Sequence, residues 1–332
     1  MIWSVVMLAC APPEEDTADQ WSYPLDDVLH FDDLQAVGTH NSYHERTAGV
    51  EIEAWDYDHR PLDDQLGVVG VRQFELDVTW DAPSHDFRVF HVALMDENSS
   101  CDWLSDCLST MRAWSDDNPA HHPIATLLEL KDNFNADEAP TLLADLDATI
   151  DATWPADRRI SPDDVQRDAA SLSAGLAERG WPTLGELRGR ALWVLHTGDD
   201  FRKLYTAGDT STSGRVVFPD AHGDLSLDVG AFSSINDPIA DAELIAAALA
   251  VGHLVRTRTD SDGNEARAND TAPREAALAS GAHFLSTDFP EPHSDTGYVV
   301  VMPDGSPSRC NPVTAPPECT SASIEDPTFV GE

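Results

Sequence analysis

Short apolar runs alternate with amphipathic segments along the chain. Eight of these runs are bounded by polar or turn-forming residues, which predicts β-strands, and several of the segments between them have the apolar spacing of helices. Strands that alternate with helices favour parallel β–α units. The expected strands are residues 34–40, 70–78, 87–92, 124–131, 191–197, 216–221, 253–259 and 283–289, and the expected helices are 61–69, 102–115, 137–153, 182–190, 239–251 and 272–280.

The unbroken series of strands predicts one α/β domain, a TIM barrel. An open, doubly wound sheet is the alternative, but no glycine-rich phosphate loop follows the first predicted strand. We expect the barrel to occupy residues 26–295. Before it we expect a signal or lipoprotein-type segment at 1–10 and an acidic flexible tether at 11–25, and after it an irregular segment at 296–332.

Two of the predicted strands carry charge on one face. Glu75 and Asp77 share a face of the second strand, and Glu129 and Lys131 share a face of the fourth, because residues i and i+2 of a strand point to the same side. Burying unpaired carboxylates would cost several kcal/mol each. Either bound cations compensate these carboxylates, or a salt-bridge network that uses Lys131 and Arg72 neutralises them.

Polar residues also end the first and third predicted strands, at His40-Asn41 and at His91. The carboxyl ends of barrel strands meet at one mouth, where barrel active sites lie. Three carboxylates and an amide oxygen suit a hard cation, Ca2+ or Mg2+, rather than zinc. Two histidines beside such a cation suit phosphodiester chemistry, in which one imidazole protonates the leaving oxygen.

The net charge and the cysteine spacing indicate which partners and which cellular compartment to expect. The formal net charge of -40 is spread along all 332 residues, which excludes nucleic acid as an expected partner. No Cys-x-x-Cys occurs and no histidine lies at metal-ligand spacing from the cysteines, so a zinc site built on the cysteines is not expected. The pairs Cys101/Cys107 and Cys310/Cys319 fit two local disulfides in an exported protein.

The N-terminal MIWSVVMLAC is a short apolar segment that ends in a small residue before Cys10. It resembles a bacterial lipoprotein signal, although no Lys or Arg precedes the apolar run. We expect an exported protein, either a surface lipoprotein lipidated at Cys10 or a secreted or periplasmic one. A cleaved signal is the second interpretation and a disordered cytosolic N-terminus the third.

Taken together, these motifs resemble the phosphatidylinositol-specific phospholipase C superfamily, and most of all its calcium-dependent, secreted microbial branch. The resemblance spans roughly residues 34–290 and implies a distorted TIM barrel. It is carried by GTHNSY (38–43), RQFELDV (72–78), FHV (90–92), LLELKD (127–132), VRTRTDSDGNEARAND (255–270) and GAHFLSTDFP (281–290).

The resemblance implies a cofactor and its ligands. The cofactor would be Ca2+, with Mg2+ poorer. The ligands would be Asn41, Glu75, Asp77 and Glu129.

The resemblance also implies the catalytic roles. His40 would contact the phosphate and stabilise the transition state, and His91 would be the general acid that protonates the departing alkoxide of diacylglycerol. The nucleophile would be the inositol 2-hydroxyl, giving a cyclic phosphate, with one metal-bound carboxylate as its base. Lys131, Arg256 and Arg258 would hold the phosphate or ring hydroxyls of a phospholipid or another phosphodiester.

Alternatives remain on the sequence alone. Sphingomyelinase D-like enzymes share the Glu-x-Asp and the two histidines, and glycerophosphodiester phosphodiesterases share the barrel. A surface lipoprotein that keeps the barrel only for binding is the non-enzymatic alternative. Asp288 either orients a catalytic group or caps a turn, and His44 is expected at the surface or behind the site.

Overall fold

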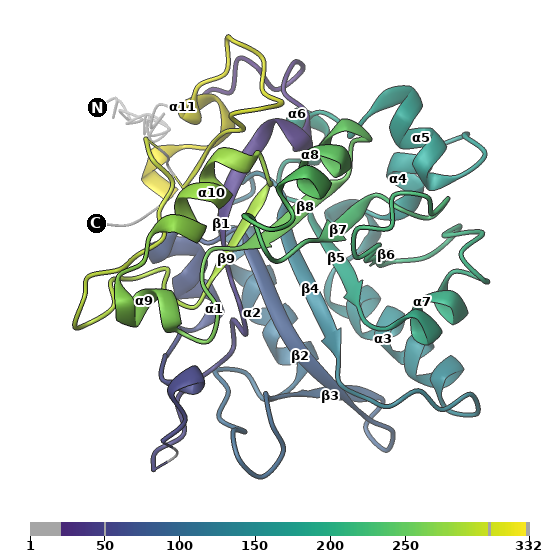
Figure 1. Cartoon of the computed structure of the whole chain (residues 1–332). Coiled ribbons are helices and arrows are strands. Elements are labelled where there is room, and N and C mark those ends of the chain that lie inside the picture. Colours follow the sequence, from purple (N-terminus) through teal and green to yellow (C-terminus); the bar gives the residue numbers. More distant parts are fainter. Residues whose placement is uncertain (1–20, 50, 305–306, 330–332) are drawn as a thin grey trace, which may run out of the picture.

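The computed structural model describes residues 21–49, 51–304 and 307–329, and it contains a distorted barrel of eight parallel strands (Figure 1). Neighbouring strands follow the order β6-β5-β4-β2-β1-β9-β8-β7. The predicted TIM barrel is therefore confirmed. The barrel strands are β1 (Leu34–Thr39), β2 (Gln73–Asp81), β4 (Ile124–Leu130), β5 (Ala191–His196), β6 (Phe218–Pro219), β7 (Phe232–Ser234), β8 (Leu254–Arg258) and β9 (Phe284–Thr287).

The barrel closes weakly between β6 and β7. These two short strands end the hydrogen-bonded order, and a single parallel bridge between Asp220 and Phe232 joins their neighbourhoods. Pairing elsewhere in the barrel is uneven, since β2 and β4 pair at six positions whereas β1 and β2 pair at one. The hydrogen-bonded order of the barrel strands is thus broken between β6 and β7.

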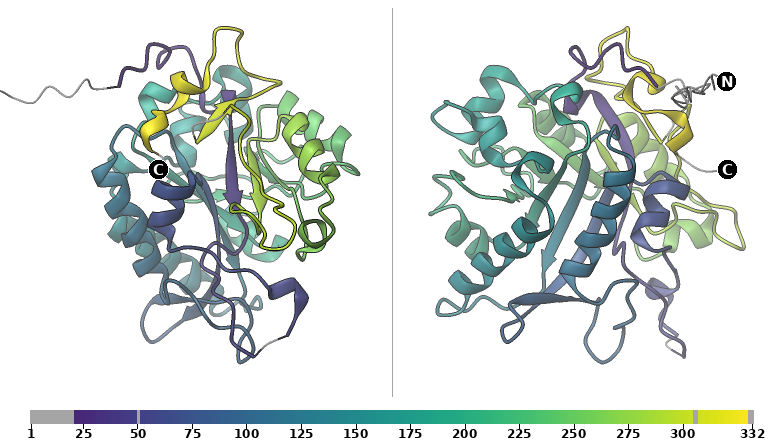
Figure 2. Two further views of the ribbon diagram at one scale, coloured as in Figure 1. Left: turned by 90° about the vertical axis from the view of Figure 1, so that its left-hand side faces the viewer. Right: turned by 180° about the vertical axis from the view of Figure 1, so that it is seen from behind.

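Helices surround the barrel, as Figures 1 and 2 show. No helix among the described residues is long and apolar enough to cross a membrane. The helices are α1 (Leu62–Asp64), α2 (Leu104–Asp117), α3 (Ala139–Thr153), α4 (Pro162–Gln166), α5 (Leu172–Arg179), α6 (Leu184–Leu187), α7 (Asp199–Tyr205), α8 (Ala242–Ala250), α9 (Asn264–Ala268), α10 (Ala272–Ser280) and α11 (Ser321–Ile324), with a π-turn at Gln65–Val69 and 3-10 turns at Phe31–Asp33, Glu53–Trp55, Ala156–Arg158 and Pro327–Phe329.

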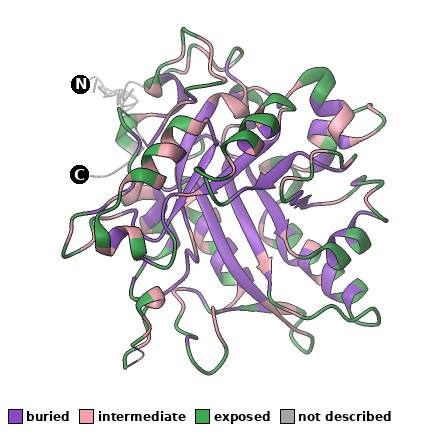
Figure 3. Ribbon diagram, in the orientation of Figure 1, coloured by how far each residue is buried: buried purple, intermediate pink, exposed green. Residues whose placement is uncertain are grey.

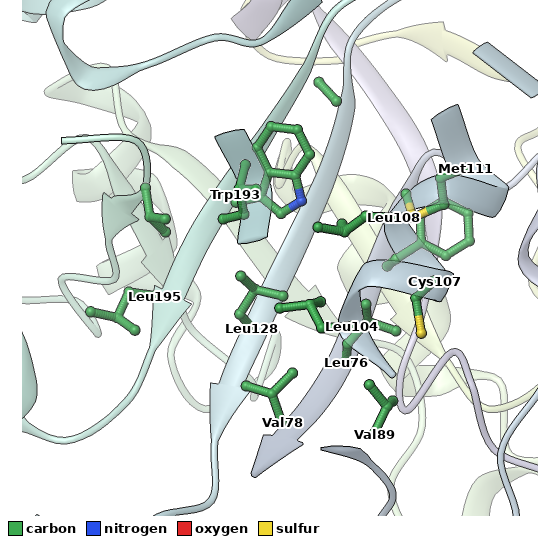
Figure 4. Packing of buried hydrophobic residues seen from close by; sticks show 14 of the residues in the cluster. Leu76, Val78, Val89, Leu104, Cys107, Leu108, Met111, Leu128, Trp193 and Leu195 are labelled. Atoms are coloured by element: carbon green, nitrogen blue, oxygen red, sulfur yellow. The ribbon is translucent and has the colours of Figure 1, made fainter. Parts of the chain in front are cut away.

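The apolar core has two main parts. One lies between the sheet and the helices α2 and α3, where Leu76, Leu128 and Trp193 pack against Leu108 and Met111 (Figure 4). The other fills the barrel interior towards the amino ends of the strands and includes residues of β1, β4, β5 and β9. The strands are accordingly buried on both faces (Figure 3), which explains their near-continuous apolar runs.

Two of the strand predictions need correction. The predicted third strand is β3 (Asp86–Val89), which pairs antiparallel with β2 as a hairpin and is not part of the barrel. Its place in the count of eight is taken by β7, which the sequence pattern did not predict. Because β2 continues to Asp81 to form the hairpin, Glu75 and Asp77 lie in the body of that strand rather than at its end.

The C-terminal segment packs at the amino end of the barrel. Its strand β10 (Ser308–Cys310) pairs antiparallel with β1, so the segment is only partly irregular. Glu325 reaches the barrel and forms a buried ion pair with Arg72, with 2.8 Å between Oε2 and Nε. The limits proposed for the domain and its flanking segments remain a prediction, and both Cys10 and the expected signal segment lie outside the described residues.

Both expected disulfides are present, Cys101–Cys107 and Cys310–Cys319. Disulfides form and persist in oxidising compartments. They therefore fit an exported protein.

Candidate active site

A row of polar side chains crosses three neighbouring strands at the mouth of the barrel. In the sheet register Asp77 of β2 lies beside Glu129 of β4, and Glu129 lies beside His196 of β5. Carboxylate oxygens of Glu75 and Glu129 and a ring nitrogen of His196 lie within 4.8 Å of one another. The period-two pattern predicted the shared faces of Glu75 with Asp77 and of Glu129 with Lys131, and the register shows why these two faces meet.

Cations of the protein partly compensate these carboxylates. Arg256 of β8 forms an ion pair with Glu75, and Lys131 Nζ lies 2.7 Å from Glu129 Oε1 and 2.8 Å from Asp77 Oδ2. Burial alone would raise the pKa of Glu75, but the guanidinium of Arg256 lowers it below its usual value. Burial, together with the charge of Glu129, raises the pKa of Asp77 well above its usual range. Three carboxylates thus share two cations.

Asn41 adds an oxygen with no donor. It adopts a left-handed backbone (φ 43°) in the turn after β1, a conformation that asparagine tolerates better than most residues. This turn is tied to β2, because Ser42 N donates to Glu75 O and Ser42 Oγ accepts from Glu75 N, both at 2.8 Å. Asn41 Nδ2 donates to Tyr57 Oη, whereas the buried Oδ1 has no hydrogen-bond partner.

These features fit a calcium ion. A buried amide oxygen without a donor is costly, and the pKa of Asp77 stays raised by burial and by Glu129 although Lys131 contacts it. A hard cation bound by oxygen atoms would relieve both costs. The donor set is therefore suitable for Ca2+ on structural grounds.

His40 lies at one side of the carboxylates and is fixed by Asp288. Its Nδ1 is 2.7 Å from Asp288 Oδ1, so Asp288 orients the ring, which was one of the two roles expected for it. Burial, and then the charge of Arg258, lowers the pKa of His40 well below its usual value. Burial also raises the pKa of Asp288, against the charge of Arg258, whose Nη2 lies 3.3 Å from Asp288 Oδ2.

His91 is held in the same way by a carboxylate that the sequence did not reveal. Asp96 Oδ2 lies 2.9 Å from His91 Nδ1 and also 2.9 Å from His44 Nε2. His44, expected at the surface or behind the site, is fully buried behind it, and its Nδ1 faces Tyr57 O at 3.0 Å. The His91 side chain keeps 21% of its surface exposed, so its Nε2 edge remains available at the mouth.

The cations differ in their access to the mouth. Arg256 is 1% exposed, and its guanidinium donates to Asn236 Oδ1 at 2.6 Å and Ser286 Oγ at 3.0 Å besides pairing with Glu75. Arg258 and Lys131 keep 15% and 29% of their side-chain surface exposed. Access to a substrate phosphate therefore favours Lys131 and Arg258 over Arg256.

Sequence reasoning missed four residues of the mouth. Asp96 lies in a loop and gives no periodic signal. His59 donates from Nε2 to His40 O at 2.9 Å, and burial lowers its pKa to about 4. His196 and Asp220 end the fifth and sixth predicted strands, so the rule that found Glu129 applies equally to them.

Comparisons with known proteins agree with this fold. A crystal structure of the calcium-dependent phosphoinositol-specific phospholipase C from a Pseudomonas species is similar at a TM-score of 0.60 and 21% identity, covering 87% of this chain and 98% of that chain. The Ca2+-dependent phosphatidylinositol-specific phospholipase C of Streptomyces antibioticus gives 0.59 and 21%, covering 79% and 96%. A search of curated proteins found no match.

A family model carries the identification further. The model of Ca2+-dependent phosphoinositide phospholipase C matches residues 29–87 and 82–312, which is most of the chain and includes every candidate site residue. The chain belongs to the Ca2+-dependent phosphoinositide phospholipase C family of phosphodiesterases.

Proposed function

We propose that this protein cleaves a phosphoinositide-like lipid by attack of the substrate's own 2-hydroxyl on phosphorus. The observation that carries the proposal is the pair of imidazole–carboxylate contacts, His40–Asp288 and His91–Asp96, which accompany an oxygen cluster suited to Ca2+. A binding module needs neither a base nor an acid. Two histidines fixed by carboxylates at one mouth support acid–base chemistry.

Asn41, Glu75, Asp77 and Glu129 would hold the calcium ion. Bound there, the ion supplies neutralisation of the phosphate charge and a lower pKa for the attacking hydroxyl. Arg256 stays buried and balances Glu75. Lys131 and Arg258 would hold phosphate oxygens, and the inositol ring would contact the polar side chains at the mouth of the barrel.

His40 would act first as a base. Its Nδ1 donates to Asp288, and burial favours the neutral ring, so Nε2 presents a lone pair rather than a proton. A neutral ring cannot give the hydrogen bond from Nε2 that the expected phosphate contact requires. We propose that Nε2 takes the proton of the 2-hydroxyl, and that the resulting imidazolium then donates to the charge developing on phosphorus.

His91 would complete the reaction as the acid. As the 2-oxygen forms its bond to phosphorus, the bond from phosphorus to the diacylglycerol oxygen breaks, and His91 Nε2–H protonates that oxygen. Asp96 holds Nδ1 and stabilises the charged ring before transfer. The products are a neutral diacylglycerol and an inositol 1,2-cyclic phosphate, and the proton taken by His40 restores the balance when it returns to His91 through solvent.

Chelation tests the metal requirement. EGTA should remove activity, Ca2+ should restore it and Mg2+ should restore it less, because Ca2+ accepts flexible oxygen coordination whereas Mg2+ requires near-ideal octahedral geometry and gives up its water reluctantly. Full activity in the presence of EGTA would contradict the assignment of these residues as calcium ligands. Glu129→Gln should raise the Ca2+ concentration needed for half activity, whereas the exposed Asp63→Asn on α1 should leave it unchanged.

Product analysis tests the substrate and the nucleophile. Phosphorus NMR of products from a panel of phosphodiester lipids should show a five-membered cyclic phosphate from inositol lipid. A cyclic product from sphingomyelin or lysolipid would support a sphingomyelinase D-like activity instead, and glycerol phosphate would support a glycerophosphodiesterase. No turnover of any member, with Ca2+ still bound, would support the surface binding module, which a lipid anchor at Cys10 would keep at the membrane.

A further inference from the structure

Three side chains outside the calcium ligands converge where β5 and β6 end. Ring nitrogens of His196 and His222 and a carboxylate oxygen of Asp220 all lie within 4.8 Å of one another. His196 Nδ1 is 2.7 Å and His222 Nδ1 is 3.5 Å from Asp220 Oδ2. These atoms lie close enough to reach one metal ion at ordinary bond lengths, about 2.0–2.2 Å for zinc, once His196 and Asp220 move slightly apart.

The Asp220 carboxylate is oriented before any metal binds. Its Oδ1 accepts from His222 N at 2.8 Å and from Ser234 N at 2.9 Å. Both backbone donors come from fixed positions beside the only bridge between β6 and β7 among the described residues. Oδ2 therefore faces the two imidazoles. In the metal-free protein it accepts a hydrogen bond from His196 Nδ1, and a metal ion bound there would displace that proton.

The proton of His222 is assigned by its surroundings. Its Nε2 lies 2.9 Å from Thr197 O, and a carbonyl oxygen only accepts hydrogen bonds, so Nε2 carries the proton. In the neutral ring Nδ1 then has a lone pair directed towards Asp220. Histidines that bind a metal through one ring nitrogen usually donate a hydrogen bond from the other nitrogen, often to a backbone carbonyl, and this bond fixes the ring.

The backbone conformation of His222 also points to a ligand site. It has φ 46°, the left-handed region that a histidine seldom adopts, and the turn continues through Gly223 at φ 80°. Left-handed backbone at a residue other than glycine is costly and concentrates at ligand sites. Here it brings His222 back over the carboxylate of Asp220.

We propose that His196 Nδ1, Asp220 Oδ2 and His222 Nδ1 form a second cation site that takes a borderline transition ion such as Zn2+. Two imidazoles and one carboxylate suit zinc, whereas the all-oxygen cluster of Asn41, Glu75, Asp77 and Glu129 suits calcium. Three protein ligands leave a fourth tetrahedral position for water or a substrate oxygen.

The site adjoins the calcium cluster, because His196 also lies within 4.8 Å of carboxylate oxygens of Glu75 and Glu129, and it differs from that cluster in offering two imidazoles. His196 lies beside Glu129 in the register of β4 and β5, so the two ions would occupy neighbouring positions of one mouth. The proposal does not depend on the phospholipase activity, because metal binding is measured directly. Failure of the lipid assays would leave it standing, and failure of the metal titration would leave the lipid assays standing.

Cobalt titration tests the site in the untagged, full-length protein. The protein is stripped with EDTA, saturated with Ca2+ and titrated with Co2+, which substitutes for Zn2+ and absorbs visibly when bound tetrahedrally. One equivalent should give intense visible absorption that Zn2+ then abolishes. H222A and D220N should weaken Co2+ binding at least about tenfold to a hundredfold, the loss that even outer partners of metal ligands cause.

Two comparisons decide the location. H85A removes a histidine that also contacts a carboxylate, with His85 Nδ1 3.0 Å from Asp145 Oδ2, but that is 68% exposed and lacks a third ligand. It should bind Co2+ as the unaltered protein does. The proposal is overturned if the Ca2+-saturated protein gives no tetrahedral Co2+ spectrum, or if E129Q abolishes the spectrum while H222A keeps it, which would place the ion among the calcium ligands.

Discussion

The two ends of the barrel both bury charge, and they do so differently. At the amino end Arg72 and Glu325, each fully buried, form one pair, and Glu325 Oε1 also accepts from His122 N at 3.0 Å. At the mouth three carboxylates share Arg256 and Lys131, and Asn41 Oδ1 has no donor. Formal charge cancels in the amino-end pair, although burial still raises the pKa of Glu325, whereas the three carboxylates at the mouth outnumber their two cations.

The difference in charge balance suggests that the buried pair at the amino end contributes to stability and that the cluster at the mouth contributes to function. A matched buried pair stabilises only as long as both partners remain, and its loss is costly because one charge is left uncompensated. An unmatched cluster is a standing cost that an incoming cation relieves. In this molecule the excess of buried negative charge lies at the candidate site, and the Arg72–Glu325 pair ties the C-terminal segment to the barrel.

Removing the proposed acid should give the largest effect. His91→Ala should lower kcat about a hundredfold to ten-thousandfold, the contribution of a general acid, while Ca2+ affinity stays nearly unchanged. Steady-state assay and calorimetric Ca2+ titration measure the two quantities. H85A, which alters an exposed histidine, is the control and should keep full activity. Full activity of His91→Ala would refute the assigned role.

The second-largest effect is a difference in stability. Removing one carboxylate at each end of the barrel should lower the free energy of unfolding by different amounts. Glu325→Gln leaves Arg72 without its partner and should lower the free energy of unfolding by about 3–5 kcal/mol, measured with urea. Glu129→Gln removes one of three neighbouring carboxylates and should cost the calcium-free protein much less. Equal losses at both ends would mean that the carboxylates of the mouth are structural pairs.

The sequence predicted this contrast only in part. Strand periodicity put Glu75 and Asp77 on one face of the second predicted strand and Glu129 and Lys131 on one face of the fourth, because the side-chain direction alternates along a strand whatever the partner strand is. The same rule would have selected His196 and Asp220, which also end apolar runs. Their omission was an incomplete application of an available signal.

Other features depend on partners that periodicity does not encode. The run that became β3 has a strand pattern, but the pattern does not say that its neighbour would be antiparallel. The contact of Asp96 with His91 depends on the path of the loop between Val92 and Cys101, and the left-handed turn at His222 follows from tertiary packing. These parts of the site required the structure.

The imbalance at the mouth should also appear as a pH dependence of stability. Burial raises the pKa of Asp77, so below the unfolded-state pKa of about 4 both states hold the proton and no penalty exists. Above it the unfolded state loses the proton first. Stability of the calcium-free protein should then fall with rising pH, by at most about 1.4 kcal/mol per pH unit from this group, until the folded pKa is passed.

Asp77→Asn isolates that contribution. Urea unfolding in EGTA at a series of pH values should show a flatter decline for Asp77→Asn than for the unaltered protein, and saturating Ca2+ should remove most of the difference in slope. The exposed Asp63→Asn is the control and should follow the unaltered curve. Parallel curves for all three proteins would show that Asp77 is adequately compensated without a metal.

The smallest expected effect comes from removing one disulfide at each end of the barrel. Cys101–Cys107 and Cys310–Cys319 join residues six and nine positions apart, and loss of loop-closure entropy predicts that each contributes about 2 kcal/mol. Replacing either pair with serines should therefore lower the free energy of unfolding by a similar amount. Stability alone will not distinguish the two ends.

Activity should distinguish them. Cys101 anchors the end of the loop that carries Asp96, whereas Cys310 lies in β10 beside the amino end of β1. The C101S/C107S variant should lose kcat several-fold, because Asp96 no longer holds His91 as firmly, and C310S/C319S should keep kcat when both are assayed fully folded. If both variants lost kcat equally, the amino end would contribute to catalysis as well, and the division between a balanced closing end and an unbalanced reacting end would not hold.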